Sequence, residues 1–80
     1  MSAAPQDQQE RYFIAEVPGF LRAWITGDLV FVYRSVLVRD DSPMFQPVLD
    51  VVGGLRPRTV DVVGAPEMAH HRAEWLIYEL

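Results

Sequence analysis

The fold is decided by residues 11–38, which read RYFIAEVPGFLRAWITGDLVFVYRSVLV. This stretch is rich in β-branched and aromatic side chains, and two short Gly-containing segments interrupt it, as is typical of strands joined by turns. The predicted strands are Arg11–Val17, Phe20–Thr26 and Leu29–Val38. Pro18-Gly19 and Gly27-Asp28 connect them. The pattern therefore predicts a three-stranded antiparallel meander.

The second connection is the clearer turn. Gly27 stands at the first central position of a two-residue loop, where a type II′ hairpin requires a positive φ. An L-Pro followed by Gly prefers type I or type II geometry, so Pro18-Gly19 fits a two-residue hairpin poorly. The register of the first strand therefore stays open at this point.

Both faces of the meander are apolar if each loop has two residues, because directly opposed residues then share a face. One face carries Tyr12, Ile14, Leu21, Ala23, Ile25, Val30, Val32, Val36 and Val38, with Glu16, opposite Leu21, and Arg34 as the polar exceptions. The other carries Phe13, Ala15, Val17, Phe20, Trp24, Leu29, Phe31, Tyr33 and Leu37, with Arg22 among them. Small antiparallel sheets commonly leave one face to water. Something else has to cover the second face of this one.

The rest of the chain predicts an α+β domain. Ser42 before Pro43 resembles a helix cap, and a short helix is expected over 44–52, stopped by Gly53-Gly54. A fourth strand is expected over Thr59–Val63. Residues 66–78 are predicted to form a C-terminal helix, because Ala69, Ala73, Leu76, Ile77 and Leu80 share one face at helical spacing.

The C-terminal segment also allows a different fold. As a strand, Ala73–Leu80 places Trp75 and Ile77 on one side and Leu76, Tyr78 and Leu80 on the other. The element order is then that of a five-stranded OB-like β-barrel. Under either alternative, residues 1–10 are expected to be a disordered leader and residues 11–80 a single domain.

Composition excludes several function classes. There is no Cys, so disulfides and thiolate metal sites are absent. The formal charge is −4, and the seven cations are all Arg and scattered along the sequence, which argues against a nucleic-acid partner. No secretory signal or membrane span is visible, so a cytoplasmic protein is expected. The absence of Lys and Asn indicates a GC-rich genome, which favours a bacterial or phage source.

No residue pattern supports catalysis. His70 and His71 are adjacent, and neighbours on a helix point about 100° apart, so one metal ion is poorly shared between them. There is no nucleophile elbow and no phosphate-binding loop. We therefore predict neither an enzyme nor a cofactor, and a metal site is not expected. An accessory subunit of an enzyme, using His70 and His71, is the third alternative.

The aromatic side chains carry the functional prediction. Phe13, Trp24, Phe31 and Tyr33, with Arg22, are the candidate partner-binding residues, because aromatic and Arg side chains dominate protein interfaces. A single terminal helix covers only one sheet face, and the other is expected to be buried in a homodimer. We predict a non-catalytic protein–protein interaction module: a small inhibitor, adaptor or accessory subunit. The alternative is a barrel that binds a small ligand or single-stranded nucleic acid through the same aromatic residues.

Overall fold

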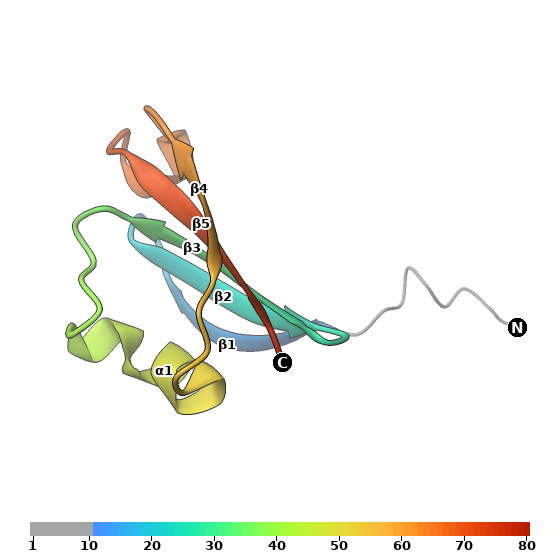
Figure 1. Cartoon of the computed structure of the whole chain (residues 1–80). Helices are drawn as coiled ribbons and strands as arrows, with labels where there is room; N and C mark the ends of the chain where they lie inside the picture. Colours follow the sequence, from blue (N-terminus) through green and yellow to red (C-terminus); the bar gives the residue numbers. More distant parts are fainter. Residues whose placement is uncertain (1–10) are drawn as a thin grey trace, which may run out of the picture.

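The computed structural model describes residues 11–80, which form an open antiparallel sheet of five strands with one short α-helix against it (Figure 1). The strands are β1 (Arg11–Val17), β2 (Leu21–Thr26), β3 (Leu29–Ser35), β4 (Arg58–Val62) and β5 (Ala73–Glu79). The helix is α1 (Gln46–Val52), and 3₁₀ turns form η1 (Pro43–Phe45) and η2 (Pro66–Met68). The α+β class is correct in outline. The predicted leader, residues 1–10, lies outside the described residues.

The strand order is β1-β2-β3-β5-β4. β1 and β4 are therefore the two edges of the sheet, and β5, the last strand in the sequence, lies inside it. The sheet does not close on itself, so the OB-like barrel is wrong although its strand count is right. In the described part of the chain, no helix is long and apolar enough to cross a bilayer.

The meander is confirmed, with one change of register. Thr26 pairs with Leu29 across a two-residue turn, and Gly27 has the positive φ of 60° that a type II′ turn requires. The first turn is one residue longer than the predicted two-residue loop, because Val17 pairs with Leu21 and the Phe20 N–H donates to the Val17 carbonyl at 2.9 Å. A β-bulge between Phe13 and Ala15 absorbs the extra residue.

Because of the bulge, the predicted faces of the first strand are wrong for the residues between the bulge and the first turn. Ala15 and Val17 turn towards the face that also carries Leu21, and Glu16 lies opposite Arg22 rather than Leu21. The third strand ends at Ser35 instead of Val38, because the Val38 N–H donates to the Ser35 carbonyl and closes a turn.

The predicted middle helix exists as η1 followed by α1. The Ser42 hydroxyl accepts a hydrogen bond from the Met44 N–H at 3.1 Å, so Ser42 is the expected cap. Gly53 ends α1 with a φ of 57°. The buried side chains Phe45, Val48 and Val52 then pack on the sheet beneath them.

The predicted C-terminal helix over 66–78 is wrong. η2 forms one short turn, and the chain then enters β5, which pairs with β3 on one side and β4 on the other. Both sides of β5 contact other side chains, so its apolar residues do not alternate with polar ones. A two-sided apolar run of this length has no decisive period, and pairing with distant strands settles its structure.

The sheet separates two apolar clusters. The helix-side face, which α1 covers, holds the main core of Leu21, Ala23, Val30, Val32, Leu76 and Tyr78. The opposite face, here called the aromatic face, is covered at one end by the loop of residues 64–72, which places Ala65 and Met68 against Tyr33 and Ala73. The rest of the aromatic face has no covering element among residues 11–80.

Candidate functional site

All five predicted contact residues lie on the aromatic face. Phe13, Trp24 and Phe31 oppose one another across β1, β2 and β3. Arg22 opposes Tyr33 in the next row along the same face. Antiparallel pairing thus brings together side chains that are up to twenty residues apart in the sequence.

The rings on this face contact one another in a continuous series. Trp24 stacks on Phe31 with ring centroids 5.7 Å apart, and its edge meets Trp75 at 5.8 Å. Trp75 in turn stacks on Tyr33 at 4.5 Å. The Arg11 guanidinium carbon lies 5.7 Å from the Trp24 ring centroid, within reach of a cation–π interaction. Mutual contact restricts the rotamers of these rings before any partner binds.

Sequence reasoning missed two members of this series. The predicted C-terminal helix includes Trp75, although the strand alternative places Trp75 beside Ile77 on one face. Arg11 was treated only as the start of a strand. Only the sheet register places Arg11 and Trp75 beside the other rings. That register depends on the bulge in β1 and on the pairing of β5 with β3.

Exposure divides the aromatic face into two parts. Tyr33 is only 7% exposed beneath the 64–72 loop, so it belongs mainly to the core. Burial raises the pKa of Tyr33 above its ordinary value of 10.0; Glu67 raises it further and Arg22 lowers it. Beyond the loop, Phe13 is 64% exposed, Val60 is 52% exposed, and Trp24, Phe31, Trp75 and Ile77 are half-buried. These last six residues form what we call the open patch.

Charged strand residues surround the open patch. Three arginines and two glutamates share the aromatic face, so the face carries a formal charge of +1 although the whole chain carries −4; they are Arg11, Arg22, Arg58, Glu16 and Glu79. Arg22 lies 3.6 Å from Glu16. Among residues 11–80, neither Arg11 nor Arg58 has an ion-pair partner.

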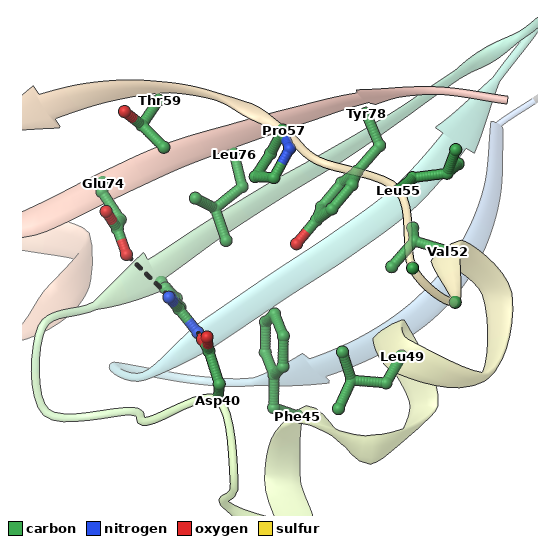
Figure 2. A pocket seen from close by; sticks show the side chains of 13 residues that line it. Asp40, Phe45, Leu49, Val52, Leu55, Pro57, Thr59, Glu74, Leu76 and Tyr78 are labelled. Atoms are coloured by element: carbon green, nitrogen blue, oxygen red, sulfur yellow. Dashed lines mark hydrogen bonds and ion pairs between the residues drawn. The ribbon is translucent and has the colours of Figure 1, made fainter.

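A groove of about 410 Å³ lies on the helix-side face (Figure 2). It runs between α1, the connector that follows it and strands β3, β4 and β5, and none of the five predicted contact residues lines it. Its walls are mixed: Phe45, Leu49, Leu55 and Leu76 are apolar, whereas Arg34, Asp40, Thr59 and Glu74 are polar or charged. The Tyr78 hydroxyl points into it.

The polar end of this groove is occupied by its own ion pairs. Arg34 donates from Nε to Oε2 of Glu74 at 2.9 Å, and its Nη1 lies 2.6 Å from Oδ1 of Asp40 without the angles of a hydrogen bond. The guanidinium carbon also lies 4.5 Å from the centroid of the Phe45 ring. The two carboxylates more than balance the single charge of Arg34, so the cluster presents no unpaired cation to a ligand. These contacts join η1 and the segment between β3 and η1 to the sheet.

The histidine pair is placed differently from the prediction. His70 and His71 lie in the 64–72 loop rather than on a helix, and both are exposed. His70 has a φ of 64° and follows Ala69 at 57°. Among residues 11–80, no group of three or more His, Asp or Glu side chains is arranged to hold a metal ion.

Comparison with known proteins gives one match. A family model described as Gene product 70 (GP70) matches residues 14–80, which is most of the chain. No curated protein and no solved structure shows significant similarity to it.

Proposed function

Because the chain belongs to the Gene product 70 family, whose name is of the kind given to phage proteins and specifies no activity, we propose its function from its surface. It is a non-catalytic interaction module that binds a partner protein in the cytoplasm through the open patch. The observation that carries this proposal is the exposure of Phe13, at 64%, beside the half-buried stacked pair Trp24 and Phe31.

The composition of the patch favours a protein partner with an apolar surface and acidic neighbours. Aromatic side chains and Arg supply most of the binding free energy at protein interfaces, provided that they are desolvated at the centre. Here Trp24 and Phe31 lie on the inner strands β2 and β3, and Phe13 lies beside them on the edge strand β1. Arg11 and Arg58 lie on the two edge strands, β1 and β4. A partner that places carboxylates around a hydrophobic contact would complement both features.

The proposal is tested by affinity capture from host-cell lysate with the wild type and two variants. Phe13→Ser removes the most exposed aromatic side chain of the patch. Leu37→Ser is the matched control, because Leu37 is 56% exposed and lies outside the patch. We expect wild type and Leu37→Ser to capture the same protein, and Phe13→Ser to bind the purified partner at least about tenfold more weakly. Equal capture by all three proteins, or no capture, would contradict the proposal.

Single-stranded nucleic acid is the second candidate for the same patch. One observation favours it: three arginines scattered in the sequence share the aromatic face with rings on which bases can stack. The formal charge of −4 disfavours it. Binding of a labelled oligothymidine at 200 mM salt that Trp24→Ala abolishes would favour nucleic acid over protein. A small-ligand barrel is disfavoured because an open sheet has no barrel interior. An accessory subunit of an enzyme that uses His70 and His71 is disfavoured because these residues lie in a loop and not on the predicted helix.

A further inference from the structure

The two edges of the sheet differ. β1 is interrupted by the bulge at Ile14, and Ile14, Ala15 and Val17 pack against the core. Bulges of this kind discourage pairing with another strand. β4 pairs regularly with β5 over all five of its residues and has no bulge, Pro or Gly within it. Among residues 11–80, no strand lies on its other side.

The free side of β4 is a template for strand addition. An edge strand presents a row of unpaired N–H and C=O groups, and most proteins protect such edges. Four of the five β4 residues are exposed, and Val60 at the strand centre is 52% exposed. We propose that β4 pairs antiparallel with β4 of a second copy of this chain, about a two-fold axis at Val60, which joins two five-stranded sheets into one.

Side-chain chemistry selects this register. A two-fold axis perpendicular to the sheet keeps each face on its own side, so it must pass through one residue that opposes itself. Centring the pair on Asp61 would set two carboxylates against each other. Centring it on Thr59 would bring Pro57, which has no N–H, into the ladder. Centring it on Val60 avoids the opposed Asp61 carboxylates, leaves Pro57 outside the ladder and pairs all five residues of β4.

The Val60-centred register also creates favourable cross-strand pairs. Thr59 of each copy opposes Asp61 of the other, so this pair occurs once on each side of the axis. Each pair allows a hydrogen bond from the Thr59 hydroxyl to the Asp61 carboxylate. Val60 opposes its own copy, and Arg58 opposes Val62. The aromatic faces of both copies then lie on the same side of one sheet, with the two Trp75 rows next to the shared Val60 pair. This proposal does not depend on the function proposed above.

The test is the oligomeric state in solution, measured by light scattering during size-exclusion chromatography and by sedimentation. We expect the wild type to dimerise at micromolar to submillimolar concentration. Val60→Lys would set two like charges against each other at the axis and weaken the dimer at least about tenfold. Val63→Lys is the control, because Val63 is 76% exposed and lies just beyond the strand. It should leave the dimer intact.

A second measurement identifies the surface. Hydrogen exchange should slow at β4 amides as wild-type concentration rises, and Val60→Lys should remove that protection. Phe13→Ser, which tests the open patch, should leave the dimer unchanged, so the two proposals can fail separately. A wild type that stays monomeric, a dimer that survives Val60→Lys, or one that Phe13→Ser dissolves would overturn β4 pairing.

Discussion

At the scale of the residue, Arg34 links more parts of the fold than any other side chain described above. It is 9% exposed, donates to Glu74 on β5, pairs with Asp40 in the segment between β3 and η1, and lies over the Phe45 ring. The sequence marks Arg34 only as a polar residue on an apolar face. Its partners could not be predicted, because Glu74 is forty residues away and was assigned to a helix.

Replacing Arg34 should destabilise the protein strongly. Arg34→Met keeps much of the apolar stem but leaves the Glu74 carboxylate partly buried without a partner, at a cost of about 2–4 kcal/mol in the free energy of unfolding. The measurement is the urea midpoint at neutral pH. The double variant Arg34→Met, Glu74→Leu should recover most of the loss, because a well-packed apolar pair can replace a buried ion pair.

Arg39→Met is the matched control for the Arg34 prediction. Arg39 lies 3.5 Å from Asp41, but both side chains are about four-fifths exposed, so their pair contributes little. Its urea midpoint should stay close to that of the wild type. An Arg34→Met midpoint equal to that of Arg39→Met would show that the Arg34 cluster does not stabilise the fold.

At the scale of the element, the 64–72 loop holds the covered end of the aromatic face in place with a strained backbone. The His70 N–H donates to the Ala65 carbonyl at 2.9 Å, which closes the loop tightly. This closure places Ala69 and His70 at positive φ, a region that costs a residue with a Cβ about 1 kcal/mol or more. The predicted helix over the same residues would have kept every φ negative.

Relieving that strain should stabilise the protein. Ala69→Gly permits a φ of 57° without a Cβ clash, and we expect a gain of about 0.5–1 kcal/mol after the larger backbone entropy of the unfolded chain is counted. For a domain of this size, that corresponds to a rise in Tm of about 2–8 °C. Thermal unfolding followed by Trp circular dichroism measures it.

Ala65→Gly is the control for the loop prediction. Ala65 is buried and has an ordinary φ of −71°, so Gly there removes packing and adds unfolded-state entropy. Its Tm should fall while that of Ala69→Gly rises. If both variants shifted Tm in the same direction, the loop strain would not be the cause.

At the scale of the whole molecule, the free energy of unfolding should fall as the pH rises above 10. Burial raises the pKa of Tyr78 above 10.0, with Asp40 and Glu74 raising it further and Arg34 lowering it. Above pH 10 the unfolded chain therefore loses this proton while the folded one keeps it. Stability is full below pH 10, falls as the pH rises towards the folded pKa and then levels off.

The alkaline loss is measured by comparing urea midpoints at pH 8 and pH 11. Tyr78→Phe should reduce the fall in the midpoint between these values, because Phe has no proton to lose. Tyr33→Phe should act in the same direction, since the pKa of Tyr33 is also raised by burial. If the urea midpoint of the double variant Tyr33→Phe, Tyr78→Phe fell between pH 8 and pH 11 as much as that of the wild type, other groups would cause the alkaline loss of stability.

Local chemistry in the sequence determined the meander, the Gly27 turn, the Ser42 cap and the presence of apolar side chains on both faces of the first three strands. Each depends on residues within a few positions of one another. The β1 bulge, the strand identity of residues 73–79, the Arg34–Glu74 pair and the open edge at β4 were decided only by the tertiary structure. These features depend on hydrogen bonds and contacts between distant segments, and the conformation of β5 in particular follows from having a strand on each side.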